Sequence, residues 1–158
     1  MGKIDADMRQ IIGASSLGYV ATVSRDGRPN LSPKGSLDVW DDDHLFFADI
    51  ASPGTIENLR HNPRVEVNFV DVIARRGYRF AGSAQIFEDG PVFDRAAEDL
   101  RNRQGPQYPC NRAVMITVET VRPLLSPAYM FNDPPPSEDA VRAVWMERLS
   151  VRPLDRSR

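Results

Sequence analysis

The residues of this chain whose types and spacing suit chemistry point first to anion binding. The run Ser52-Pro53-Gly54-Thr55 stands where a helix is predicted to begin, with Ser52 able to cap it and Pro53 suited to its first position. Backbone N–H groups at a helix N-terminus, together with the Thr55 hydroxyl, favour a phosphate through free donors and the helix dipole. The alternative is a capped helix that binds nothing.

Cations that could serve this site come from two other segments. Lys34 lies in the run Ser32–Ser36, where proline, lysine and glycine interrupt a predicted strand. Such an interruption indicates either close approach of a ligand to the backbone or a β-bulge on an edge strand. Arg75, Arg76 and Arg79 surround a later strand. They would either add to an anion site or be ordinary solvated side chains.

Metal and nucleophilic chemistry have little support. The consecutive residues 41–44, Asp-Asp-Asp-His, point in different directions and fit a solvated hairpin turn better than a metal site. The chain has only two histidines, so no metal ligand set is expected. Its single cysteine, Cys110, excludes an internal disulfide and has no histidine near it in sequence to activate it.

Length and charge narrow the class of protein. A chain of 158 residues is expected to form one domain. Lys and Arg number 20 against 22 Asp and Glu, a balance that argues against a dedicated nucleic-acid binder. No apolar run is long enough to span a membrane, and the first residues lack the pattern of a signal peptide. A cytoplasmic protein is expected.

Hydrophobic periodicity predicts an opening helix followed by a meander of about six strands. Ile4, Met8, Ile11 and Ile12 share one helical face. The predicted strands cover residues 19–23, 29–39, 44–48, 65–70, 79–87 and 113–118, with helices after Ser52 and over 92–103. Strands joined by short turns such as Asp26-Gly27 make antiparallel sheet, and closure into a barrel would remove the exposed edges.

Prolines and a glycine interrupt two of the predicted strands, and the composition changes near the end of the chain. Prolines 29 and 33 predict that strand 29–39 is an edge or is interrupted, and Gly82 predicts a bend or a close backbone contact. We expect a domain over 1–122, with 123–158 as a proline-rich arm of the same domain. Within that arm Ser137 would cap a short helix that carries Val141, Val144 and Trp145, and 152–158 would fray.

The ordered set of these segments resembles the pyridoxamine 5′-phosphate oxidase-related flavin-binding proteins. The resemblance covers roughly residues 5–122 and lies in the set rather than in any one piece. The matching segments are Gly18–Val23, Asp26–Asn30, Ser32–Ser36, Leu45–Asp49, Thr55–Leu59, Asn62–Val65, Gly77–Phe80, Gly82–Ile86 and Asp89–Pro91.

The resemblance implies a mainly β, α+β fold: a six-stranded antiparallel split β-barrel with short peripheral helices. It also implies a homodimer that binds FMN in the cleft between its subunits. The residues that would line the isoalloxazine and ribityl chain are Ser32, Pro33, Lys34, Gly35 and Ser36, with Ala48 and Asp49 beside the flavin. Those that would hold the phosphate are Gly54, Thr55 and Asn58, and those that would close the site are Gly77, Tyr78 and Arg79.

The chain also departs from the vitamin-synthesising oxidase. Gly54-Thr55 stands where that enzyme has paired basic residues, and its Tyr-x-x-x-Arg-x-x-x-Ser substrate pattern is absent after Pro91. We therefore expect an FMN-dependent oxidoreductase for a different small molecule, with no catalytic residue assigned. Lys34 or Arg79 near the pyrimidine end would stabilise anionic reduced flavin. The alternatives are a non-catalytic flavin store or redox sensor, a deazaflavin- or haem-binding relative, and an oligonucleotide-binding barrel.

Overall fold

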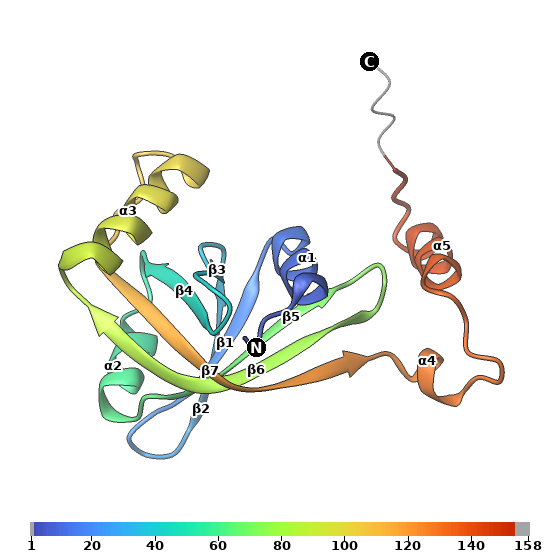
Figure 1. Ribbon diagram of the computed structural model, residues 1–158, viewed down its shortest axis with the longest axis horizontal. Helices are drawn as coiled ribbons and strands as arrows, with labels where there is room; N and C mark the ends of the chain where they lie inside the picture. The colour runs from blue at the N-terminus through green and yellow to red at the C-terminus, as the bar shows by residue number, and fades with distance from the viewer. Residues whose placement is uncertain (1, 154–158) are drawn as a thin grey trace.

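The computed structural model describes residues 2–153 and shows one curled antiparallel sheet with short helices around it (Figure 1). The strand order is β2-β1-β5-β6-β7-β4-β3. The strands are β1 (Gly18–Val23), β2 (Pro29–Lys34), β3 (Asp38–Val39), β4 (His44–Asp49), β5 (Arg64–Asp71), β6 (Arg76–Phe87) and β7 (Arg112–Leu125). The helices are α1 (Ala6–Ala14), α2 (Pro53–His61), α3 (Gly90–Gln104), α4 (Pro127–Phe131) and α5 (Glu138–Arg148). The predicted split-barrel class is confirmed, with seven strands in place of six.

The curl of the sheet follows from one short connection. β2 and β3 are the two outer strands of the sheet, yet only residues 35–37 separate Lys34 from Asp38. Four steps of extended chain span at most about 14 Å, so the two edges must approach each other. The sheet is therefore a barrel left open along one seam, and Lys34 lies at that seam.

The seventh strand arises because the predicted strand 29–39 breaks in two. At the break the Ser36 hydroxyl accepts a 3.1 Å hydrogen bond from the Ala48 N–H and donates one of 2.9 Å to the Ala48 carbonyl. A side chain thus takes the backbone groups of β4 that a continuous strand would have used. The interruption predicted from the prolines is confirmed, and β2 is an edge strand.

β6 and β7 form the longest pairing and cross the whole sheet (Figure 1). Their register shifts between Ala81 and Gly82, where a Cβ atom on Gly82 would lie 2.0 Å from the Thr117 carbonyl oxygen. The close backbone approach predicted at Gly82 is confirmed. β7 continues through Pro123, past its predicted end, because β4 pairs with it only as far as Thr117. Beyond that point one side of β7 is open, so a residue without an N–H breaks no sheet bond there.

Two hydrophobic clusters support the site. Ile4, Ile11 and Ile12 of the α1 region fill the curl of the sheet against residues such as Phe69, and the Asp5 carboxylate caps α1 at the Met8 N–H. A smaller cluster of Phe46, Ala96 and Ala113 lies under α3. The helical face predicted for Ile4, Met8, Ile11 and Ile12 is confirmed.

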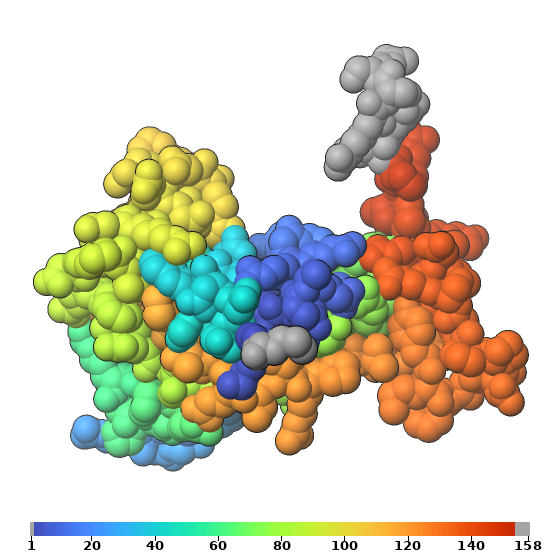
Figure 2. All heavy atoms as spheres, viewed as in Figure 1, coloured from blue at the N-terminus to red at the C-terminus, as the bar shows by residue number. Residues whose placement is uncertain are grey.

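Residues 126–153, which we call the C-terminal arm, leave the far end of β7 and form a separate lobe (Figures 1 and 2). α4 and α5 lie in this arm, and the Ser137 hydroxyl accepts a hydrogen bond from the Ala140 N–H as predicted. The tail predicted to fray over 152–158 lies mostly outside the described residues. Within residues 2–153, every helix is too short or too polar to cross a membrane.

Candidate functional site

The site begins at a buried lysine on the open seam of the barrel. Lys34, the last residue of β2, is only 6% exposed. Its Nζ donates a 2.7 Å hydrogen bond to the Ser32 hydroxyl and lies 5.5 Å from the centre of the Phe47 ring on β4. The structure therefore brings Ser32, Lys34, Ser36 and Ala48 together where β2 and β4 meet.

The charge of Lys34 is incompletely compensated. Burial lowers the pKa of its ammonium, and the nearby Asp49 carboxylate offsets only part of this effect. Across residues 2–153 no carboxylate lies within ion-pair distance of Lys34. An ammonium carries three donors and Ser32 takes one. The remaining donors favour a ligand that presents oxygen or nitrogen acceptors.

Asp49, at the end of β4, is 2% exposed and governs the start of α2. Its carboxylate accepts hydrogen bonds from the Ser52 N–H at 3.0 Å and from the Ser52 hydroxyl at 2.7 Å, and lies 3.5 Å from Arg112. The prediction that the Ser52 side chain caps α2 is wrong, because its hydroxyl is donated to Asp49 instead. Asp49 presents an acceptor beside Lys34, which suits hydroxyl groups of a ligand better than a second anion.

The first turn of α2 keeps free donors. Gly54 and Thr55 lie too early in the helix for their N–H groups to find partners within it, and the structure records none for them elsewhere in residues 2–153. Thr55 is 2% exposed, and its hydroxyl makes no hydrogen bond to any described residue. A Cβ on Gly54 would meet nothing within 4 Å, so the space above this turn is open. This turn fits a phosphate group in donor chemistry and in room.

Asn58, which is predicted to help hold a phosphate, has a structural partner within the chain. Its amide donates a 3.0 Å hydrogen bond to the hydroxyl of Thr22 on β1, which also accepts from Asn30 at 3.2 Å. Asn58 is 7% exposed, so this is an internal link between α2 and the sheet. The structure places Asn58 near Thr55 and uses one of its two amide N–H groups in the fold, so its contact with a phosphate stays a prediction.

Gly77, Tyr78 and Arg79 lie apart from this cluster within one copy of the chain. Pro33, Tyr19, Asn68 and Arg79 form one row across β2, β1, β5 and β6. Three strand spacings of about 4.8 Å separate Arg79 from β2, so it stands roughly 14 Å away along the sheet. Its Nε bonds to Asn68 at 3.2 Å. These residues do not join the Lys34 site unless a second copy brings them to it.

The neighbouring residues on β6 have structural partners. A Cβ on Gly77 would lie 2.0 Å from the Phe69 carbonyl oxygen, so the strand pairing itself requires glycine. The Tyr78 hydroxyl donates a 2.5 Å hydrogen bond to Asp7 on α1, which raises the pKa of Tyr78 to about 12. Arg76 binds Asp7 at 2.8 Å and Glu138 of α5 at 2.6 Å. These contacts hold α1 and α5 against the sheet.

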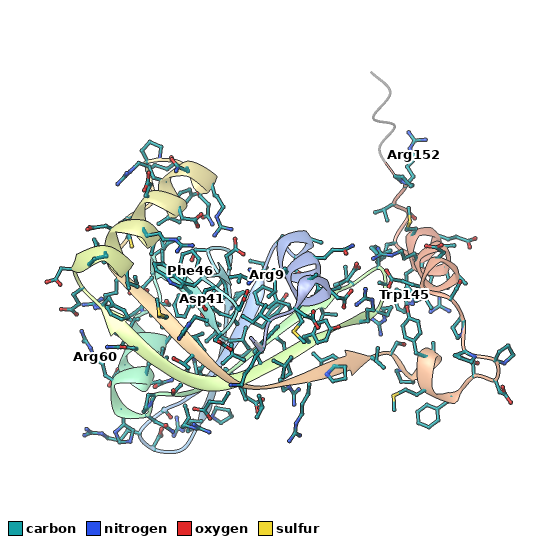
Figure 3. All side chains as sticks on the ribbon, viewed as in Figure 1. Arg9, Asp41, Phe46, Arg60, Trp145 and Arg152 are labelled. Carbon is teal, nitrogen blue, oxygen red and sulfur yellow. The ribbon has the colours of Figure 1, made fainter. Side chains whose placement is uncertain are left out.

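The remaining cations and acids also have local partners. Arg75 stacks at 4.1 Å on the ring of Trp145 and so supports the arm. Figure 3 labels Trp145 on α5. In the turn 41–44, His44 bonds to Asp41 at 2.8 Å, and Asp42 pairs with Arg9. Asp43 accepts a 3.1 Å hydrogen bond from the Lys3 N–H. The three aspartates thus serve different partners, and residues 2–153 hold no group of three or more ligands arranged for a metal.

Sequence reasoning missed a hollow on the outer side of α2. It has a volume of about 670 Å³ and lies between the β1–β2 hairpin and the end of the helix. Its lining residues are Ser24, Arg25, Asp26, Glu57, Asn58, Arg60 and His61. The signal available was the spacing of Glu57, Arg60 and His61, which places three charged or titratable side chains on one helical face.

The comparisons with known proteins agree with this architecture. The family model described as pyridoxamine 5′-phosphate oxidase matches residues 4–125. The crystal structure of HupZ from Group A Streptococcus superposes on this chain with a TM-score of 0.72 and 32% sequence identity. The match covers 78% of this chain and 95% of the HupZ chain. An FMN-binding protein of Syntrophomonas wolfei is 20% identical, covers 73% of this chain and 82% of its own, and has a TM-score of 0.67.

The chain is also similar to a curated protein. An uncharacterized protein of Methanocaldococcus jannaschii is 26% identical over 110 residues, which cover 68% of this chain and 72% of the relative. The matched region contains the whole sheet, the Lys34 cluster and the first turn of α2, and ends where the C-terminal arm begins. The chain belongs to the pyridoxamine 5′-phosphate oxidase family.

Proposed function

We propose that this protein binds FMN and uses it as an oxidoreductase on a small molecule, with two copies of the chain enclosing two equivalent sites. The observation that carries the proposal is Lys34, a buried ammonium with unused donors on the open seam of a barrel of this family. The FMN-binding protein that shares the fold supports the choice of cofactor. FMN would supply the electron-transfer chemistry, and the chain would bind and orient it.

The residues of the seam match the parts of FMN. Lys34 would donate to the acceptors of the isoalloxazine, and its charge would favour the reduced, anionic ring. The Asp49 carboxylate would accept from ribityl hydroxyls. The N–H groups of Gly54 and Thr55, with the Thr55 hydroxyl, would hold the phosphate at the start of α2. Lys34 is the only buried cation in this set, since Gly54-Thr55 brings no basic side chain to the helix.

The second copy is proposed on two grounds. Arg79 lies three strands from β2 in its own chain, so it could reach a flavin only across an interface. The outer face of the same sheet exposes Leu31 by 65%, Tyr19 by 41% and Val23 by 38%. Contiguous apolar side chains on one face are typical of an interaction surface.

The first experiment is a visible absorption spectrum of the purified protein, followed by mass analysis of the molecule that heat releases. A flavin spectrum with the mass of FMN supports the proposal. Titration of FMN into Lys34→Met should then show weaker binding by about tenfold or more, the loss of one charged hydrogen bond. Lys3→Met, which alters the other lysine of the chain, is the matched control and should bind like wild type.

The alternatives give different results. A colourless protein that does not bind added FMN contradicts the proposal. A deazaflavin spectrum would mean that the cofactor is a deazaflavin and not FMN. Bound FMN that neither NADH nor NADPH reduces at a useful rate favours a flavin store or redox sensor. Binding of oligonucleotide that falls steeply with salt would favour the barrel as a nucleic-acid module.

A further inference from the structure

Two adjacent residues at the start of β7 hold the segment that leads into α2. The Asn111 N–H donates a 2.8 Å hydrogen bond to the Asp49 carbonyl, and the Asn111 side-chain amide donates one of 2.7 Å to the Ile50 carbonyl. Arg112, the next residue, brings its guanidinium to 3.5 Å from the Asp49 carboxylate. These contacts fix the chain, and the carboxylate of Asp49, just before the helix begins.

The Asp49 carboxylate places a negative charge at the N-terminus of α2. It is buried, and it accepts hydrogen bonds from both the N–H and the hydroxyl of Ser52, the residue that precedes the helix. The dipole of a helix is equivalent to about half a positive charge at this end. One carboxylate more than balances that charge, so the dipole alone does not attract a second anion to the turn of Gly54 and Thr55.

A phosphate at this turn needs a cation that α2 does not bring to it. A phosphate monoester carries about −1.5 to −2 charges at pH 7. The first turn of α2 has no basic residue, and the basic residues of this helix, Arg60 and His61, lie in its last turn. The cation closest to hand is Arg112, which reaches this end of the helix from another strand.

Arg112 also contacts a second carboxylate, which it shares with another arginine. Its Nε donates a 3.0 Å hydrogen bond to Glu88, and Glu88 accepts one of 2.6 Å from Arg60. The Glu88 side chain is 59% exposed, whereas that of Asp49 is 3% exposed. Water and salt screen an exposed ion pair far more than a buried one. The charge of Arg112 therefore acts mainly on Asp49.

We propose that Arg112 determines the preference of this site for a phosphorylated flavin. It acts through Asp49, as a positioning residue: its charge cancels that of the buried carboxylate. The helix dipole and the N–H groups of Gly54 and Thr55 are then left to the phosphate of the ligand. The inference rests on the proposed function, and adds to it a residue that the sequence analysis did not select.

The test compares FMN with riboflavin, which is the same flavin without the phosphate group. Isothermal titration of both into the full-length, cofactor-free protein gives a ratio of affinities that isolates the phosphate. Arg112→Gln should lower the affinity for FMN by about tenfold and leave that for riboflavin unchanged, because the uncompensated carboxylate then opposes the phosphate. Arg112→Lys keeps the charge and should retain most of the ratio. Arg64→Gln, the matched control, removes a cation from an exposed ion pair with Glu119 and should leave the ratio unchanged.

A second substitution separates the charge of Arg112 from its structural contacts. Asp49→Asn removes the negative charge and keeps an oxygen that can accept from Ser52. Arg112→Gln combined with Asp49→Asn should therefore regain most of the lost ratio. A merely structural role for Arg112 predicts a double variant no better than Arg112→Gln alone. Any contact of residue 49 with the ribityl chain is common to both flavins and cancels in the ratio.

The outcomes separate the inference from the proposed function. If wild type binds FMN, three results overturn the role of Arg112 and leave the FMN proposal standing: equal affinities for FMN and riboflavin, a ratio that Arg112→Gln leaves unchanged, or a double variant that regains nothing. If wild type binds neither flavin, the proposed cofactor is contradicted and inorganic phosphate becomes the probe. Its effect on the NMR signals of the Gly54 and Thr55 N–H groups should then be lost in Arg112→Gln and return in the double variant. No effect of phosphate on wild type would overturn the inference as well.

Discussion

The amide of Asn58 on α2 donates a 3.0 Å hydrogen bond to the hydroxyl of Thr22 on β1, and both side chains are buried. This bond is the side-chain link between the helix and the sheet at the predicted phosphate site. Thr55, one turn earlier on the same helix, has a hydroxyl without a partner among the described residues. We therefore expect replacement of Asn58 to affect stability and replacement of Thr55 to affect ligand binding.

Replacing Asn58 should affect the fold. Asn58→Leu removes the bond to Thr22 and should lower the free energy of unfolding by about 1–2 kcal/mol, since Thr22 retains only the donor from Asn30. Urea unfolding followed by circular dichroism measures this change. An unchanged midpoint would mean that the bond adds nothing to stability.

Replacing Thr55 should affect binding. Thr55→Val keeps the shape of the side chain and removes a hydroxyl that the fold does not use, so the unfolding midpoint should move little. If the first turn of α2 holds the FMN phosphate, affinity for FMN should fall by about tenfold. Isothermal titration of the cofactor-free protein gives the affinity, and binding as tight as that of wild type would place the phosphate elsewhere.

Lys34 should titrate below the ordinary lysine value of 10.5, because burial disfavours its charged form. Lys3 is the only other lysine, so reductive carbon-13 methylation gives two lysine NMR signals, besides that of the α-amine, to follow with pH. The Lys34 signal should shift at the lower pH. Two identical titrations would contradict the burial of Lys34.

The same burial has a consequence for stability. Between its lowered pKa and 10.5 the unfolded chain holds a proton that the folded chain has released, so stability rises with pH in that window. Below the window the buried charge costs free energy. Lys34→Met should therefore raise the free energy of unfolding at neutral pH even as it weakens FMN binding. Lys3→Met should do neither.

The root of the C-terminal arm should be sensitive to acid. Hydrogen bonds from Arg76 hold the pKa of Asp7 and of Glu138 below the usual carboxyl values. Groups with a lowered pKa stabilise the fold above about pH 4, and this contribution is lost as the pH falls through their folded values. Docking of α5 should weaken in that range, as reported by the fluorescence of Trp145 after Trp40→Phe removes the other tryptophan.

Arg76→Gln provides the test of this assignment. This substitution should weaken docking of the arm at neutral pH. It should also make the Trp145 fluorescence less dependent on pH, because Asp7 and Glu138 lose the arginine that lowers their pKa values most. Arg60→Gln breaks an exposed ion pair with Glu88 and should leave the Trp145 signal unchanged. A response of equal size in both variants would point to a general effect of charge.

Three glycines should respond differently to alanine. In Gly77→Ala and Gly82→Ala the new Cβ would meet a backbone carbonyl at 2.0 Å, so each should cost about 3 kcal/mol or prevent folding. Gly54→Ala places its Cβ in open space and should fold normally. Thermal unfolding of the three variants checks this order, which would be contradicted if Gly54→Ala were the least stable.

The sequence predicts the elements of this fold well where a local pattern and tertiary packing agree. The alternation of apolar and polar residues predicts β5, and helical spacing predicts the buried face of α1. The predicted strand boundaries are wrong where residues distant in sequence determine where a strand breaks or ends. Ser36 breaks a strand because Ala48 takes its hydroxyl, and β7 passes through Pro123 because β4 has already ended. Neither partner is visible from the local sequence.

The sequence likewise predicts only part of the candidate site. The residue types at Lys34 and Thr55 predict an anion or cofactor site, and the structure adds that both side chains are buried and retain unused donors. The sequence could not show that Asn58 is committed to Thr22, that Ser52 donates to Asp49, or that Arg75 and Arg76 brace the arm. Each of these partners lies on a different element.

The pairing of β4 with β7 also sets the order in which the molecule can be made. His44 pairs with Thr117 and Asp49 with Arg112, so β4 must wait for most of the chain to be synthesised before its partner exists. During that time the apolar β4 strand has an unpaired edge, the kind of surface on which nascent chains associate wrongly. Contacts so distant in sequence also slow the closing step itself. Expression at low temperature and with chaperones present should therefore improve the yield of this protein more than mutations that stabilise its folded state.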